Sequence, residues 1–442
     1  MSGVSRGIDG IEVTFDDPNL VANAGLIIPA TLMARLGLEA LVNDIVRLVG
    51  RVGGSQPGRK ICTLVAAMLA GGSHIDHADV LRAGATGRVL GFRVMAPSTL
   101  GTFLRAFSFG HVRQLDRVIA ETIRRAWALG AGPGSEPLVI DMDSTISEVY
   151  GNKKHGAAYG YTKVLGYHPL VATRADTGEV LHARLRKGSS QRGHKRFAGE
   201  LIARVRRAGA TGAMCLRADS GFWSHALIDT LKRLGVGWSV TVTINKSIRR
   251  AIDAITEDAW TPIVYPDGGV AEVADTTYVT GRGRQRRSYR LVVRRTRLTD
   301  PAQLAMWPNW RHHAFVTSST ADAVTVDRFH RDHATVELAI GDLKEGAGLA
   351  HCPSGRFPAN GAWLACAVLA HNLFRWTNQL GGIRHLDELT VAATQRTRLI
   401  AVPGRLVNRS GTPTLRLPTH WPWARPFNQA LSRLRTLRPV PV

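Results

Sequence analysis

The segment 138–145 constrains the fold more than any other stretch of this sequence. Apolar residues fill every second position of its first half, as in a strand with one buried face, and the opposite face ends in Asp141 and Asp143. A carboxylate that loses water without gaining a partner costs several kcal/mol, so both acids need a cation, hydrogen bonds or solvent. We interpret the segment as a core strand that carries acids to a site at its end. A strand that ends in an ordinary polar turn is the alternative.

A second acid follows a later strand. After a Gly/Pro-rich linker, the periodicity predicts three strands, a helix, a strand, a helix and a strand, near 138–143, 165–173, 180–185, 195–207, 214–219, 224–234 and 238–243. The fourth of these strands ends at Asp219. Catalytic groups collect at the carboxyl ends of strands in open sheets, so we expect Asp219 to lie near Asp141 and Asp143.

A third acid lies on a predicted helix after a strand near 314–317. At 100° per residue, His330, His333, Glu337 and Lys344 fall within an arc of about 60°. An adjoining apolar stripe would pack on the sheet and turn Glu337 toward the strand ends. A solvated, mixed-charge face is the alternative.

The net charge points to a polyanionic partner. The chain has 57 Lys and Arg against 34 Asp and Glu, a formal charge of +23, which favours nucleic acid. Eight arginines lie between 282 and 297, and among them Arg284, Arg286 and Arg287 are expected to contact phosphate rather than to form a solvated face. Nearby tryptophans are expected in the core rather than stacked on bases; they are Trp260, Trp307 and Trp310.

The region 16–130 reads as short helices separated by glycine turns. Interspersed arginines favour a helix-turn-helix DNA reader, and a helical cap without DNA contacts is the alternative. The N-terminus has no apolar signal segment, and the longest apolar run, near 362–370, is far below the roughly 20 residues of a membrane span. The four cysteines show no pairing that indicates zinc or disulfides. We therefore expect a bacterial cytoplasmic, nucleoid-associated protein without a membrane partner.

Five segments, in this order, resemble a DDE transposase of bacterial insertion sequences, in the branch named after insertion sequence 1380. They are Asp141–Thr145, Gly156–Tyr161, Gly166–Leu170, Arg217–Phe222 and Val336–Lys344. Residues from about 60 to 380 follow the layout of that family. The resemblance implies an α/β, ribonuclease-H-like mixed sheet with flanking helices, an all-α N-terminal domain and a β-rich insertion before the last acidic helix. The implied divisions are 1–130, 137–244, 245–312, 313–380 and a basic C-terminal tail, 381–442.

The resemblance also implies that Asp143, Asp219 and Glu337 are the catalytic, metal-binding acids. Asp143 stands directly before a hydroxyl pair, as the family's first acid does, and Asp141 remains the alternative. The family signature on the last helix is Tyr, Arg, Glu and Lys. This chain keeps the spacing and Lys344, expected to contact a phosphate, but has His330 for Tyr and His333 for Arg. Both histidines are expected to contact DNA, more weakly than the original pair at neutral pH.

Three carboxylates suit two-metal phosphodiester cleavage, with Mg²⁺ as cofactor and Mn²⁺ as substitute. The function implied is a transposase that binds the ends of its element on double-stranded DNA, cleaves them and joins the 3′-ends to target DNA, as a homodimer in the DNA complex. A metal-dependent nuclease without strand transfer and a catalytically silent DNA-binding regulator are the alternatives.

Overall fold

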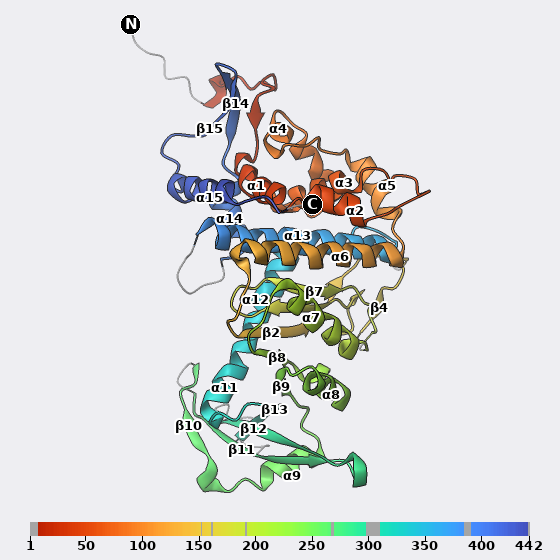
Figure 1. Cartoon of the computed structure of the whole chain (residues 1–442), viewed down its shortest axis with the longest axis vertical. Helices are drawn as coiled ribbons and strands as arrows, with labels where there is room; N and C mark the ends of the chain where they lie inside the picture. Colours follow the sequence, from red (N-terminus) through yellow and green to blue (C-terminus); the bar gives the residue numbers. More distant parts are fainter. Residues whose placement is uncertain are drawn as a thin grey trace.

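The computed structural model describes residues 8–151, 153–160, 162–190, 192–266, 269–297, 310–383 and 390–440. Its core is a nine-stranded mixed sheet in the order β10-β11-β12-β13-β9-β8-β2-β6-β7 (Figure 1). The strands are β2 Leu138–Ser144, β6 Leu170–Arg174, β7 Val180–Arg184, β8 Met214–Ala218, β9 Gly237–Thr241, β10 Thr261–Ile263, β11 Ala271–Thr280, β12 Arg287–Arg297 and β13 Trp310–Thr317.

β2 is the central strand of the half of the sheet that carries the acids. It runs parallel to β8, which runs parallel to β9, and it pairs antiparallel with β6, which pairs antiparallel with β7. Ile140 and Met142 are fully buried on one face of β2, as their alternation predicts. The expected strands near 165–173 form β6 and a short strand, β5 (Leu165–Tyr167), in a small separate sheet with β3 (Ser147–Glu148) and β4 (Ala158–Tyr159).

Helices cover the sheet. α7 (His194–Ala208) packs on β7, and α8 (His225–Arg233) packs on α7 and β9. The expected single helix bearing Glu337 is instead four consecutive pieces, α11 Ala323–Arg331, η9 Asp332–Ala334, α12 Thr335–Gly341 and η10 Asp342–Gly346. η9 is a 3₁₀ turn and η10 a π turn, so a uniform 100° per residue does not hold along this segment. α12 packs on β2 and β6, which brings it to the central strand.

The N-terminal region is helical, as expected. Its elements are η1 Ile8–Gly10, η2 Ala24–Leu26, α1 Ile27–Arg35, α2 Leu38–Ile45, α3 Pro57–Leu69, η3 Ile75–Leu81, α4 Thr86–Leu90, α5 Pro97–Arg105, α6 Phe109–Ala126 and η4 Trp127–Ala131. The periodicity continues across α1 and α2, but the chain turns between them at Gly37, whose φ of 61° suits glycine. No single helix in the described part of the chain is long and apolar enough to cross a membrane; one bent pair, 24–35 with 38–45, meets the length and composition test.

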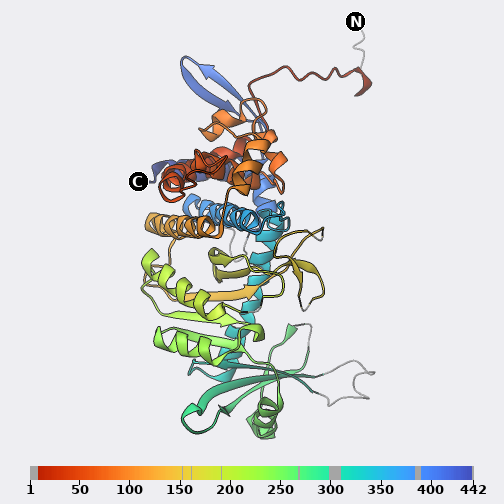
Figure 2. The same cartoon turned by 90° about the vertical axis from the view of Figure 1, so that its right-hand side faces the viewer.

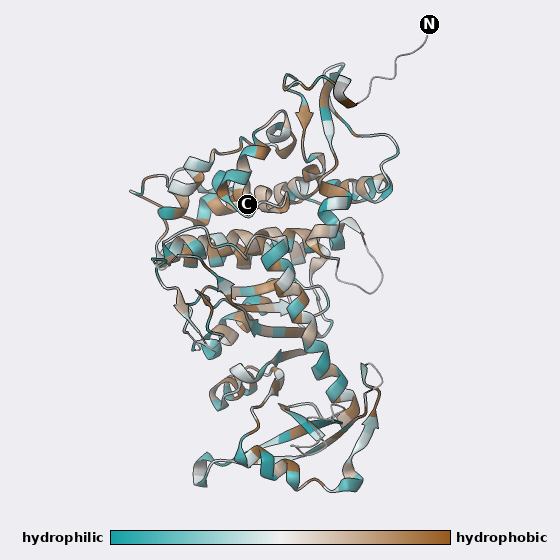
Figure 3. Cartoon of the chain, turned by 180° about the vertical axis from the view of Figure 1, so that it is seen from behind, coloured by the Kyte–Doolittle hydropathy of each residue, from teal (hydrophilic) through white to brown (hydrophobic). Residues whose placement is uncertain are grey.

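One long helix, α13 (Phe357–Gly381), joins the two halves of the molecule. It lies beside α6, and these two helices separate the N-terminal helices from the sheet (Figures 1 and 2). Nearly all of α13 is buried, including Trp363 and Trp376, and apolar colours predominate along it in Figure 3. A helix that is apolar on all sides needs partners on all sides, and α3, α5, α6 and β7 supply them.

The insertion extends the sheet that carries the acids rather than forming a separate one. β13 pairs antiparallel with β9, with Phe315 opposite Thr241, and β12, β11 and β10 follow outward. The helical pieces of this region are α9 Lys246–Asp253, η6 Glu257–Ala259 and η8 Gly283–Gln285. Trp260 is buried, in line with the expectation that it belongs to the core, whereas Trp307 lies outside the described residues.

The C-terminal segment expected as a basic tail is folded in its described part. It contains α14 Ala392–Gln395, η11 Arg396–Ile400, β14 Gly404–Arg409, β15 Thr412–Arg416 and α15 Ala424–Thr436. β14 pairs with β1 (Leu20–Val21) near the N-terminus, and α15 packs on α1 and α13. The described N-terminal and C-terminal segments therefore pack against each other in the same helical layer.

Candidate active site

Asp143 and Asp219 come together because two parallel strands end side by side. The register of β2 and β8 pairs Asp141 with Arg217 and Met142 with Ala218. One residue further along each strand stand Asp143 and Asp219, both at the carboxyl ends, as the sequence predicts. The strand order therefore creates a pair of carboxylates at one edge of the sheet.

The carboxylate of Asp143 is half-buried and has no cationic hydrogen-bond partner among the described residues. It accepts a hydrogen bond from the Ser144 backbone N–H, 2.6 Å from Oδ1. Burial raises the pKa of Asp143 to about 6, and the nearby charges of Asp219 and Glu337 add to the rise, while His333 and the Ser144 N–H oppose it. Repulsion among three acids in one place is an arrangement that a bound cation relieves.

Asp219 has two structural features that bear on its role. Its Oδ1 accepts the Gly221 N–H at 3.1 Å, so the side chain caps the short helix η5 (Ser220–Phe222). Solvent reaches this carboxylate, yet surrounding protein atoms desolvate it in part and thereby raise its pKa, against the opposing effects of Gly221, His333 and His168. The cap leaves Oδ2 without a hydrogen bond within the described part of the chain.

Glu337 reaches the same place from α12. It is exposed on the helix that packs on β2, and its charge raises the pKa of Asp143. The structure therefore brings together the three acids that the family resemblance selects. Their ligating atoms do not form a tight cluster, because the only set of three in the described residues within 4.8 Å of one another lies elsewhere.

Asp141, the alternative first acid, has another environment. It is fully buried, its two oxygens accept hydrogen bonds from Arg217 Nε and Nη2 at 2.7 and 2.8 Å, and Oδ1 also lies 2.8 Å from His333 Nδ1. Both oxygens are thus committed to protein partners. Of the two acids on this face of β2, Asp143 is the one that remains available to a ligand.

His330 does not reach the surface. It is 4% exposed, its ring stacks on Phe315, and its nitrogens lie 2.8 Å from Ser239 Oγ and 2.9 Å from Thr241 Oγ1. Burial, first of all, lowers the pKa of His330 well below its usual value, which leaves the ring neutral. We correct the expectation of a phosphate contact here: the break between α11 and α12 turns His330 into the sheet, away from Glu337.

His333 and Lys344 are both partly shielded from solvent. The His333 side chain is largely buried, held by Asp141, and close enough to Asp143 and Asp219 to lower the pKa of both carboxyls. Lys344 lies in η10 and is half-buried, with no side-chain partner among the described residues.

The arginine run divides into structural and free side chains. Arg290 pairs with Asp275, Arg294 with Asp327, and Arg295 with both Glu257 and Glu272. The run therefore has more acidic partners than its local sequence shows, because they come from other elements. Arg287 also pairs, with Asp229 at 2.7 Å. Arg286 is exposed and without a partner in the described residues, and the side chain of Arg284 lies outside them.

Sequence reasoning missed two residues beside the acids. Arg217 neutralises Asp141, and His168 bridges Ser144 Oγ at 2.9 Å and the Ser190 carbonyl oxygen at 2.8 Å. Arg217 and His168 both lie in short segments that carry the family resemblance. That membership was the only feature of the sequence that could have indicated a role for them.

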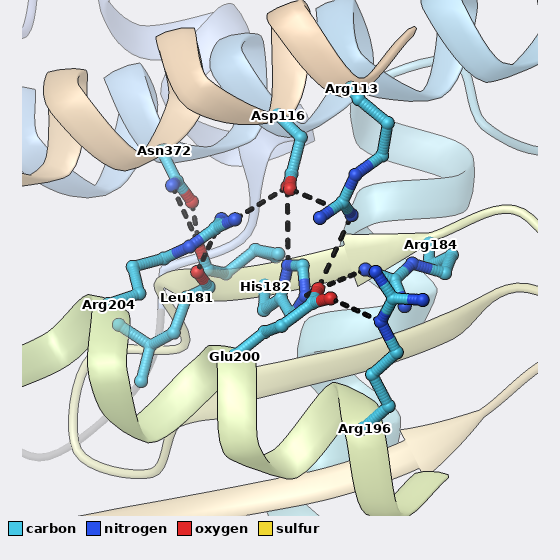
Figure 4. Close-up of polar contacts among 10 residues, drawn as sticks. Arg113, Asp116, Leu181, His182, Arg184, Arg196, Glu200, Arg204 and Asn372 are labelled. Atoms are coloured by element: carbon cyan, nitrogen blue, oxygen red, sulfur yellow. Dashed lines mark hydrogen bonds and ion pairs between the residues drawn. The ribbon is translucent and has the colours of Figure 1, made fainter. Parts of the chain in front are cut away.

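The one tight group of potential metal ligands in the described residues is Asp116, His182 and Glu200, on α6, β7 and α7. His182 lies 3.4 Å from a carboxylate oxygen of each acid (Figure 4). Four guanidinium groups surround these carboxylates; they belong to Arg113, Arg184, Arg196 and Arg204. Since the cations already outnumber the acids, a divalent metal would meet repulsion, and we interpret the cluster as an ion-pair network that ties α6 to the sheet.

The chain is similar to a family model and to solved structures. None of the curated proteins matches the chain. A solved structure entitled piggyBac transposase synaptic complex with hairpin DNA is similar over 86% of this chain and 79% of its own, at 13% identity and a TM-score of 0.42. The family described as Transposase DDE domain group 1 matches residues 6–439. Because that match spans nearly the whole sequence, this chain belongs to the DDE transposase family.

Proposed function

We propose that this DDE transposase cleaves DNA at the ends of its element and joins the freed 3′-ends to target DNA, with Asp143, Asp219 and Glu337 as the metal-binding acids. The observation that carries the proposal is the contrast among the acids. Asp141, Asp327 and Asp342 are buried and paired with arginine, whereas Asp143 and Asp219, at the ends of neighbouring parallel strands, have no arginine partner among the described residues. The strand order around β2 supports a ribonuclease-H-like core, and the five motif segments support the branch of insertion sequence 1380.

The donor set fits hard divalent cations. Three carboxylates offer only oxygen ligands, as Mg²⁺ prefers and Mn²⁺ accepts. The proposed reaction uses two such cations about 4 Å apart. Bound there, the cations would supply activation of the attacking oxygen and stabilisation of the leaving oxygen in an in-line displacement.

The other residues of the site would hold the DNA. His333, fixed by Asp141, would present its second ring nitrogen to a phosphate beside the acids, and Lys344 would place a point charge on a flanking phosphate. Arg286, on the exposed turn between β11 and β12, would contact the backbone further away. We propose double-stranded DNA as the partner and a homodimer as the state in the DNA complex.

The decisive experiment is the substitution Asp219→Asn. As a helix cap, Asn replaces Asp with little loss, so the fold and the contact with Gly221 survive. As a metal ligand it lacks the charge, so Mg²⁺-dependent nicking of end-bearing DNA should fall by about three orders of magnitude or more while DNA binding persists. Nicking within about tenfold of wild type would remove Asp219 from the active site.

A strand-transfer assay separates this function from its two alternatives. Joining of 3′-ends to a target plasmid supports a transposase, cutting without joining indicates a nuclease, and binding without either indicates a regulator. Asp322→Asn, an exposed helix-cap acid on α11, is the matched control and should leave all three activities unchanged.

A further inference from the structure

A large basic cavity lies in the helical layer, away from the acids. It has a volume of about 1010 Å³ and is open to solvent between the start of α3, the end of η3, α4 and the start of α5. α13 and α6 separate this part of the molecule from the sheet (Figure 1). The cavity is therefore a place where a ligand would contact the protein without touching the carboxylates.

The charges that line the cavity are of one sign. Among the described residues that line it, none is acidic, and the basic ones are Arg59, Lys60, Arg82, Arg88 and Arg93. Lys60 has a structural task, because its Nζ donates to the carbonyl oxygens of Gly53 and Ser55 at 2.6 and 2.5 Å. The remaining four charges are arginines on the wall of the cavity.

Two of these arginines have no partner in the described part of the chain. Arg88 and Arg93 are exposed and form no hydrogen bond or ion pair with their side chains. Arg82 and Arg59 each pair with one acid, Asp79 at 2.6 Å and Glu39 at 3.2 Å, and these pairs are partly exposed and therefore weak. Four planar guanidinium groups around one cavity can donate hydrogen bonds to the oxygens of a phosphate.

The backbone of the cavity also favours an anion. Three glycines contribute to its wall, Gly84, Gly87 and Gly91, and a Cβ added at Gly91 would meet no atom within 4 Å, so the wall is open at that point. The first turn of α5 adjoins the cavity at Thr99 and has no side-chain cap, which leaves backbone N–H groups and the positive end of the helix dipole on that side.

We propose that this cavity binds the sugar-phosphate backbone of double-stranded DNA at a distance from the cleavage point. The proposal rests on the proposed function, since a transposase must hold its element beyond the few phosphates at the scissile bond. Contacts made by arginine to phosphate position the DNA and carry no sequence information themselves. An acidic protein segment is the competing occupant.

The test replaces both free arginines, Arg88→Ala with Arg93→Ala, in the full chain. The control, Arg249→Ala with Arg250→Ala, removes the same charge from exposed positions on α9, at the opposite end of the molecule (Figure 1). Affinity for a fluorescent duplex of random sequence is measured across a salt series, and melting curves verify the fold of each variant. We expect the cavity variant to bind about tenfold or more weakly, with a log–log salt slope reduced by about two.

The outcomes distinguish the cavity from charge in general and from the active site. Equal losses in the two variants, or no loss in either, would overturn the proposal. A cavity variant that keeps its DNA affinity but loses binding to polyglutamate would assign the cavity to an acidic protein segment. At saturating DNA the cavity variant should still nick in Mg²⁺, whereas failure of the proposed function itself would appear as a wild-type protein that does not nick.

Discussion

The Nδ1 of His333 lies 2.8 Å from Oδ1 of Asp141, a buried carboxylate that Arg217 grips through both oxygens. This contact fixes the ring at the edge of the acid cluster with its other nitrogen free of Asp141. His333→Asn should keep a donor toward Asp141 but remove the second ring nitrogen. We expect nicking to fall by about 10- to 100-fold with little change in melting temperature, as measured by single-turnover cleavage at saturating DNA. Unchanged cleavage would limit His333 to a structural role.

Asp141 and Asp143 should respond oppositely to the same substitution. Asp141→Asn leaves the buried Arg217 with an incomplete partner, which should lower stability by about 3 kcal/mol. Asp143→Asn removes a carboxyl whose ionised form the fold disfavours, so stability at pH 7.5 should stay the same or rise by up to about 2 kcal/mol. Urea unfolding of both variants without metal measures this. Equal destabilisation would contradict the assignment of structural and functional acids.

Added metal should stabilise the protein through the same carboxylates. Cations bound to the native acid cluster would relieve its repulsion, so Mn²⁺ or Mg²⁺ at about 100 times its Kd should add about 2.7 kcal/mol to the free energy of unfolding. The increase in melting temperature should vanish in Asp219→Asn and persist in Asp116→Asn, which changes the arginine-rich cluster. The opposite pattern would place the metal at Asp116.

Glu179 should make stability depend on pH. Its carboxylate is fully buried and accepts hydrogen bonds from Trp127 Nε1 and Trp376 Nε1, yet burial raises its pKa to about 7. The native state keeps the Glu179 proton up to about pH 7, whereas the unfolded state releases it near pH 4.5. The contribution of Glu179 to the free energy of unfolding is therefore intact below pH 4.5 and is lost as the pH rises to 7. Glu179→Gln should gain about 2–3 kcal/mol relative to wild type between pH 5 and 8 in urea unfolding. Glu148→Gln changes an exposed glutamate, and its free energy of unfolding should depend on pH in the same way as that of wild type.

Substitution of two different arginines in the 282–297 run should affect DNA affinity in one case and stability in the other. Arg286→Ala removes an exposed charge and should weaken binding to all duplexes alike, with a salt slope smaller by about one and no change in stability. Arg294→Ala leaves Asp327 with one fewer arginine in a fully buried place and should destabilise the protein by about 3 kcal/mol. A matched binding titration and melting curve for each variant measures both quantities.

Local patterns predicted much of the architecture because they depend on neighbours in the chain. Alternation predicted β2, and helical periodicity with glycine breaks predicted α3 and α7 within a few residues. Contacts between distant segments were invisible. Arg217 neutralises Asp141 from 76 positions away, Arg294 reaches Asp327 from another element, and the turn η9 reorients His330, so charge and burial at these positions required the structure.

The position of α13 late in the sequence has a consequence for synthesis of the protein. A ribosome that has completed β2 and β8 has made two of the acids, but Glu337 and the helix on which α3, α5 and α6 rest come later. A chain that stops early therefore lacks both the third acid and the support of the basic cavity. A prematurely terminated chain would therefore lose two requirements of the proposed function at once, the complete set of acids and the packing that supports the proposed DNA-binding cavity.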